Sequence, residues 1–207
     1  MKRLLGLGTA LGVLALGLPM AANADSTFTT GAGTPLTASA HLDFTIVIPK
    51  FVYLRVGDGT NFATNAVIDN IVYTVAAANV GSGTAVTGVG GDLTGGQVTA
   101  RVIGNNGNIT FTSTTLGALS DGATDSISYS QISTAVATNT STTALGHPTL
   151  IDGGTTTLAL VPNIGTKVTN LDAKWTFTYL NAAIVPQGTY GGINTNNSRV
   201  VYTASMP

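Results

Sequence analysis

The chain has 207 residues, only 8% of them are charged, and its formal net charge at pH 7 is −1. All nine acidic residues are Asp, and the sequence contains no Cys. A chain without a basic stripe is a poor candidate for nucleic-acid binding. The absence of Cys excludes disulfides, so the core and the backbone hydrogen bonds must stabilise the folded chain.

Residues 1–24 have the three-part layout of a cleavable export signal. Two basic residues precede an uncharged run over 4–18, and Ala22 and Ala24 occupy the −3 and −1 positions of a small-residue cleavage site. The run is shorter than the ~20 residues of a membrane-spanning helix. We therefore predict a signal helix that is removed after Sec-type export to the periplasm, the cell surface or the extracellular space, with no stable membrane span afterwards. A retained membrane anchor is the alternative.

The segment after the predicted cleavage site has two parts. Residues 25–35 are rich in Thr, Gly and Ser and are predicted to be flexible. Residues 36–48 alternate strictly, and their even positions hold Leu36, Ala38, Ala40, Leu42, Phe44, Ile46 and Ile48. This period places one apolar row on one face of a strand. A strand over 36–48 would span ~43 Å, whereas five or six residues are usual. The segment therefore either bends to serve two sheets or extends beyond its own domain.

The rest of the chain shows a β pattern, with Gly and Asn clusters between short runs rich in Thr, Val and Ile. We predict strands at 51–56, 71–76, 97–103, 108–113, 126–130, 157–161, 173–179 and 199–205. Residues 80–96 and 114–126 are predicted loops, and a short helix is considered at 62–70 or 130–138. The Asn-Gly pair at 106–107 favours a type I′ hairpin between two of these strands.

Many short strands without alternating helices predict an all-β fold of antiparallel sheets packed as an Ig-like β-sandwich. A closed sheet is the alternative architecture. The predicted domain order is a signal peptide at 1–24, a flexible segment at 25–35 and a single β-sandwich domain at 36–207.

Catalytic motifs are missing from the sequence. His41 falls on the polar face of the alternating segment and His147 precedes a proline, but no G-x-S-x-G elbow accompanies either. Phosphate-binding glycine motifs and H-E-x-x-H are absent as well. We therefore predict no catalytic residues and no cofactor, and we expect a protein that is not an enzyme.

Two further features were considered as binding sites. The Asp-Gly loops at 57–61, 121–125 and 152–154 offer oxygen ligands, but none has the carboxylate spacing that calcium requires, so turns stabilised by Asp side chains are preferred and no metal is predicted. Trp175 and Tyr179 could form a sugar-stacking platform. Because they share an alternating strand with Phe177, a place in the core is the preferred interpretation.

The two ends of the chain carry a family resemblance. The export signal, the long alternating strand near the mature N-terminus, and the turn at 188–190 leading to the strand Val200-Val201-Tyr202-Thr203 together resemble secreted bacterial surface β-sandwich proteins of the pilin or fimbrial-subunit kind. The last strand also resembles the closing strand of WxL-type surface domains.

We therefore expect an exported, non-enzymatic structural or surface protein, a fibre or matrix subunit that assembles by β-strand addition. The candidate inserting row is Leu36, Ala38, Ala40, Leu42 and Phe44. The expected partners are other copies of the chain or other envelope proteins. Two alternatives stay open: 36–48 could be the first strand of its own domain, and the protein could be a soluble periplasmic or secreted binding module, for example for carbohydrate.

Overall fold

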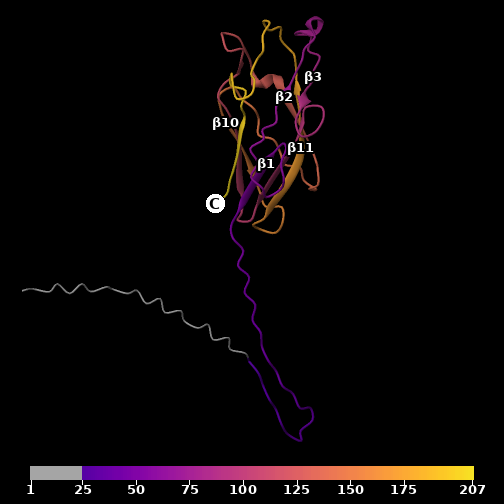
Figure 1. Ribbon diagram of the computed structural model, residues 1–207, viewed down its shortest axis with the longest axis vertical. Coiled ribbons are helices and arrows are strands. Elements are labelled where there is room, and N and C mark those ends of the chain that lie inside the picture. The colour runs from indigo at the N-terminus through magenta and orange to yellow at the C-terminus, as the bar shows by residue number, and fades with distance from the viewer. Residues whose placement is uncertain (1–24) are drawn as a thin grey trace, which may run out of the picture. The chain divides into compact units, whose positions relative to one another are not determined.

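A computed structural model describes residues 25–207, and the chain divides into two units, Met1–Ile48 and Pro49–Pro207 (Figure 1). The predicted signal helix and its cleavage residues Ala22 and Ala24 lie outside the described residues. Residues 25–51 contain no strand. The second unit holds the strands, which form antiparallel sheets with almost no helix, so the all-β prediction is confirmed.

Two main sheets make up the second unit. The larger sheet contains β1 (Val52–Val56), β3 (Val86–Thr87), β5 (Gln97–Gly104), β9 (Ile132–Ala137) and β11 (Thr169–Tyr179). Its central strand is β11, which pairs with β5 and β3 along one side and with β9 along the other. The smaller sheet contains β6 (Ile109–Thr115) between β10 (Gly154–Leu160) and β12 (Val201–Ser205).

Short elements complete the unit. β2 (Ile71–Val72) pairs with β4 (Val89–Gly90), and β7 (Leu119–Ser120) pairs with β8 (Ser126–Ile127). Two 3₁₀ turns, η1 (Ala77–Asn79) and η2 (Tyr129–Gln131), lie in the connections. The Ser128 side chain caps η2 by accepting a hydrogen bond from the backbone N–H of Ser130, as expected for a serine at an N-cap.

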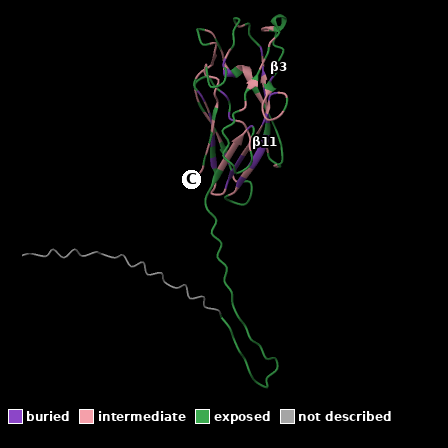
Figure 2. Cartoon of the chain, in the orientation of Figure 1, coloured by how far each residue is buried: buried purple, intermediate pink, exposed green. Residues whose placement is uncertain are grey.

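The two main sheets pack face to face over one core (Figure 2). The register pairs Trp175 with Val98 across β11 and β5, and all of Val98, Ala100 and Val102 are buried. Phe111 on β6 meets this layer from the other sheet, with its ring stacked 6.1 Å from that of Trp175. Both side chains are fully buried, which confirms the sequence interpretation of Trp175 as a core residue.

Most predicted strands are present, with shifted ends. Those at 51–56, 97–103, 108–113, 157–161, 173–179 and 199–205 correspond to β1, β5, β6, β10, β11 and β12. Of the strands predicted at 71–76 and 126–130, only the first two residues of each form a strand, as β2 and β8. β3 and β4 fall inside the predicted loop at 80–96, and β7 inside that at 114–126.

Two sequence predictions are wrong. The turn at 105–108 does not form a hairpin, because β5 and β6 belong to different sheets and the turn carries the chain from one layer to the other. The helix considered at 130–138 is the short turn η2 followed by β9, whose Ile132, Thr134 and Val136 lie opposite the inward row of β11. Residues 36–48 form no strand with the rest of residues 25–207, and their pairing beyond their own domain stays a prediction.

Truncation of Phe111 tests the face-to-face core. Phe111→Ala is expected to lower the free energy of unfolding by about 3–5 kcal/mol, because it removes a fully buried ring and leaves a cavity beside Trp175. The measurement is urea unfolding followed by the fluorescence of Trp175, the only tryptophan. Leu116→Ala is the control, since Leu116 is exposed and its loss is expected to cost less than about 0.5 kcal/mol. Equal costs for the two variants would contradict the described core.

Candidate functional site

The N-terminal segment 36–48 is the leading candidate site because its apolar row is exposed. The exposed fraction is 76% for Leu42 and 84% for both Phe44 and Ile46. The smaller members of the candidate row, Ala38 and Ala40, are exposed as well, and so is Leu36. The backbone is extended without ladder hydrogen bonds, so the segment presents both an apolar face and free backbone groups.

One polar contact lies within this first unit. The Nδ1–H of the His41 ring donates a hydrogen bond to the carboxylate of Asp25, and the two side chains form an ion pair when the ring is protonated. Both side chains are largely exposed, so this pair contributes little stability. His41 is therefore paired with Asp25 inside the first unit.

Residues 144–152 form a crossing segment that connects the two sheets on the side of β9 and β10. Ala144 bridges to Asp172 on β11, and the indole N–H of Trp175 donates to the Leu145 carbonyl at 2.9 Å. At the other end, the hydroxyls of Ser113 and Thr156 donate to the Thr149 carbonyl. Leu145 and Leu150 are buried between the layers. The chain itself therefore fills this side of the core.

Asp172 fixes the start of the crossing segment. Its carboxylate accepts hydrogen bonds from the backbone N–H groups of Thr140 and Ser141, at 2.9 and 2.7 Å, and from their hydroxyls. Burial alone would raise the pKa of Asp172, but these hydrogen bonds outweigh it and hold the pKa well below its ordinary value. A buried carboxylate with this many donors is a structural anchor.

His147 lies in the crossing segment and reaches into the aromatic core. Its ring packs edge-on against Trp175 and Phe177, and its Nε2 lies 2.6 Å from the hydroxyl of Tyr202 on β12. Desolvation lowers the pKa of His147 to about 4, against the opposing effect of a hydrogen bond to the Pro148 backbone. The ring is therefore neutral at neutral pH. Its position between Gly146 and Pro148 gave no periodic signal from which the sequence could place it.

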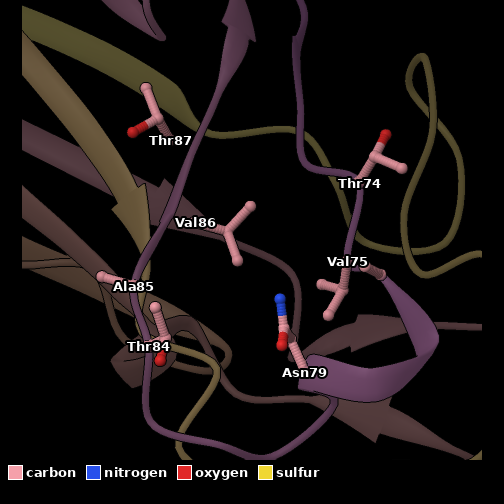
Figure 3. Close-up of a pocket in the computed structure, with 8 residues that line it drawn as sticks. Thr74, Val75, Asn79, Thr84, Ala85, Val86 and Thr87 are labelled. Atoms are coloured by element: carbon pink, nitrogen blue, oxygen red, sulfur yellow. The ribbon is translucent and has the colours of Figure 1, made fainter.

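A pocket of about 290 Å³ lies near η1, between the chain at 74–76 and β3 (Figure 3). Val75 and Val86 point into it from opposite walls, with Asn79 at one end. Asn181 holds this end, because its side-chain amide donates to the Asn79 carbonyl and accepts from the Gly81 N–H. The lining consists of Thr74, Val75, Ala76, Asn79, Thr84, Ala85, Val86 and Thr87. None of these residues is acidic, basic or His, so the pocket offers no acid–base chemistry.

One of the three Asp-Gly loops makes the predicted turn, and the Asp side chains of the other regions bind more distant backbone groups. Asp121 accepts hydrogen bonds from the N–H groups of Ala123 and Asp125, which is the predicted turn stabilised by an Asp side chain. Asp152 accepts from the Tyr129 N–H at 2.6 Å, and Asp69 accepts from the Asp58 N–H at 2.7 Å. Among residues 25–207 no three His or Asp side chains gather in a way that could hold a metal ion.

Comparisons with protein-family models, with curated proteins and with solved structures give no match. Over the described part of the chain, no helix has the length and apolar character needed to cross a membrane. The function is therefore inferred from the residues and geometry of this chain.

The buried imidazole of His147 predicts a stability change in mild acid. Its pKa is about 4 in the folded chain and 6.5 ordinarily, so the unfolded chain takes up the proton first. The free energy of unfolding is expected to be full above pH 6.5 and to fall toward pH 4, by up to about 1.4 kcal/mol per pH unit. The pKa of Asp172 is also lowered, but there the folded chain favours the charged form, so this contribution to stability is lost only as the pH falls below the ordinary pKa of 3.8.

Urea unfolding of the wild type, His147→Phe and His41→Gln between pH 7 and pH 4.5 measures this slope. We expect His147→Phe to flatten it, because the aromatic replacement keeps the packing and removes the titrating group. His41→Gln, which changes the largely exposed histidine, serves as the control and is expected to keep the slope. A wild-type slope that survives in His147→Phe would exclude His147 as its source.

Proposed function

We propose that this chain is an exported, non-enzymatic structural protein of the cell envelope, a fibre or matrix subunit that assembles by β-strand addition. The observation that carries the proposal is the N-terminal segment 36–48, which is extended, unpaired and lined by an exposed apolar row. In strand addition, such a segment supplies main-chain hydrogen bonds to a sheet edge, and its alternate side chains enter the partner's core.

The energetics favour a buried state for the row. Full burial of Leu42, Phe44, Ile46 and Ile48 would contribute on the order of 6–12 kcal/mol from the hydrophobic effect. Association itself costs about 4–15 kcal/mol, so the row alone is barely sufficient. The backbone ladder that forms with a sheet edge supplies the rest, because each unpaired N–H and C=O gains a partner. Strand addition would therefore use both the alternating apolar side chains and the unpaired backbone groups of segment 36–48.

The Ig-like form of the sandwich and the export signal belong to the same proposal. A β-sandwich with a free terminal segment resembles the pilin or fimbrial-subunit kind of protein, and export through a Sec-type signal would bring it to the envelope. The expected partners are other copies of the chain or other envelope proteins. The low charge of the chain, 8% charged residues, reduces the repulsion between identical copies.

A carbohydrate-binding module is the less favoured alternative. Its best sequence feature was an aromatic platform on the strand of Trp175 and Tyr179. Trp175 is fully buried and Tyr179 nearly so, so neither ring is available to stack on a sugar.

The assembly proposal predicts polymers that depend on the apolar row. The exported protein, purified without residues 1–24, is expected to elute as a mixture of oligomers and to form fibres in electron micrographs. Phe44→Asp is expected to shift it to monomer, because a carboxylate would have to be buried in the partner's core. Thr45→Asp places the same charge on the polar row and is the matched control, with assembly expected to persist.

Deletion of 26–48 is the second variant and is expected to leave a monomer with an unchanged circular dichroism spectrum, since the strands all lie in Pro49–Pro207. A wild-type protein that remains monomeric over a wide concentration range, or a deletion variant that still assembles, would contradict the proposed function.

The export part of the proposal predicts a defined new N-terminus. Cleavage after Ala24 would make Asp25 the first residue of the mature protein. Intact-mass measurement of the protein recovered from outside the cytoplasm is expected to give the mass of residues 25–207. Ala24→Leu places a bulky residue at the cleavage position and is expected to leave the precursor uncut. Recovery of the full-length mass from the wild type would contradict cleavage at this site.

A further inference from the structure

We infer that the pocket between residues 74–76 and β3 binds a neutral, polyhydroxylated ring of the size of one hexose. All of its lining residues belong to the second unit, and segment 36–48 contributes none of them. The site is therefore independent of the proposed assembly, and it would give the chain a ligand-binding role in addition to a structural one. It is also separate from the aromatic strand of Trp175, whose ring the core buries.

The pocket is formed by a β-hairpin whose two arms move apart. At one end, β2 and β4 pair in the register that places Val72 opposite Val89. Continued along the two arms, this register would place Val75 opposite Val86. The arms do not pair there, and β3, which contains Val86, pairs with β11 instead. The arm at 74–76 therefore stands apart from β3, and the space between them is the pocket.

The lining combines apolar walls with hydrogen-bonding groups. Val75 and Val86 face each other across the space (Figure 3), and three threonines and Asn79 supply hydroxyl and amide groups. Among residues 25–207, the side chains of these four polar residues have no hydrogen-bond partner, and the backbone groups of Thr74 and Val75 have none either. The pocket therefore offers donors and acceptors that the described chain does not use itself.

One buried residue fixes the end of the pocket. Asn181 follows β11 and is only 1% exposed. Its side-chain amide binds the Asn79 carbonyl at 2.7 Å and the Gly81 N–H at 2.9 Å, and its backbone carbonyl accepts from the Gly83 N–H at 2.9 Å. Its φ of 53° lies in the left-handed region, which Asn adopts more readily than most residues. The wall is therefore held before a ligand arrives, which lowers the cost of binding.

The chemistry of the lining favours a neutral ligand with several hydroxyls. Because the lining contains no Lys, Arg, His or Asp, a charged ligand would lose hydration without gaining an opposite charge. A purely apolar ligand fits poorly as well, since it would take water from the hydroxyl and amide groups without replacing its hydrogen bonds. A polyhydroxylated ring satisfies both requirements, because its hydroxyls meet the polar groups and its C–H face lies against the valines.

The size of the pocket limits the ligand to one ring. Its volume is about 290 Å³, at the lower end of the ~300–1,000 Å³ that ligand pockets usually have. No aromatic side chain lines it, so no ring-stacking contribution strengthens the binding. For a single ring in such a pocket we expect a dissociation constant on the order of 1 mM.

Saturation-transfer NMR, which observes the ligand, tests the site because it detects weak binding and works with large assemblies. The probes are methyl glucoside, methyl galactoside, methyl mannoside and myo-inositol, added to the exported protein purified without residues 1–24. We expect saturation transfer to at least one of them. Glucuronate and cyclohexanol are the charged and the mainly apolar comparison rings, and we expect each to bind about tenfold more weakly or less. No transfer to any neutral probe, or equal binding of a comparison ring, would overturn the inference.

A filled pocket assigns the binding to this place. Val75→Phe puts a larger side chain into the pocket without breaking a strand ladder, because Val75 is outside the strands, and we expect it to abolish saturation transfer. Val89→Phe makes the same change at a 74% exposed position of the same hairpin that does not line the pocket, and we expect it to keep the wild-type affinity. Equal affinities of the two variants would refute the assignment to this pocket.

Removal of the lining hydroxyls is a second test that does not depend on the larger side chain being tolerated. Valine is close to threonine in shape, so the triple replacement to Val is expected to keep the fold and to weaken binding about tenfold or more. The replaced residues are Thr74, Thr84 and Thr87. The matched control replaces three exposed threonines of the smaller sheet by Val, namely Thr110, Thr157 and Thr203. An unchanged affinity in the pocket variant, or the same loss in the control, would contradict the proposed ligand site.

Discussion

The pairing of β11 on both of its sides is the interaction on which the second unit depends. Its eleven residues hold β5 and β3 on one side and β9 on the other, while its inward row supplies Trp175 to the core. β5 is also paired on both sides, with β1 and β11, and β6 has the same role in the smaller sheet. The remaining strands lie at the edges of the sheets, and these edges differ in how far other parts of the chain cover them.

The two sides of the sandwich differ in which segments of the chain cover them. On the β9–β10 side, Asp172 gathers the donors of Thr140 and Ser141 and fixes the chain at the point where it turns between the sheets. The carboxylate must stay charged for this arrangement, and its lowered pKa shows that the hydrogen bonds favour the charged form. On the β1–β12 side, the loop that follows β1 contacts that strand, because Tyr53 and Arg55 donate hydrogen bonds to the carbonyls of Thr60 and Gly59, and the inward-facing Val52 is 43% exposed.

The sequence predicted the parts of this fold that depend on local alternation. β5 and β11 were clear because their inward rows alternate over many residues with polar neighbours. The connection at 105–108 was predicted incorrectly, since Asn-Gly chemistry specifies a reversal but not which sheet receives the next strand. That choice depends on β10 and β12, the distant partners of β6. β9 was missed because its Ser, Thr and Ala residues fit a helix as well, and only pairing with β11 decides between them.

For the candidate site as well, the sequence predicted the local pattern but not the surroundings of the residues. The apolar row from Leu36 to Ile48 is legible in the sequence, but its exposure depends on the absence of a partner strand, which no local pattern encodes. The partial exposure of Val52 and Tyr202 was hidden for the same reason, because both look like ordinary core residues in the sequence. His147 and Asp172 were also missed as structural residues, since their surroundings are assembled from segments distant in the chain.

The direct connection of residue 48 to β1 has a mechanical consequence. β1 begins four residues later and is paired with β5 in five consecutive positions. A tensile load applied through the N-terminal segment, along the strand axis and against an anchor at the far end of the sheet, would act on these hydrogen bonds in shear. They would then resist together instead of opening one after another. A subunit connected in this way is suited to bearing load along its length, and it would be weakest to a pull directed away from the sheet.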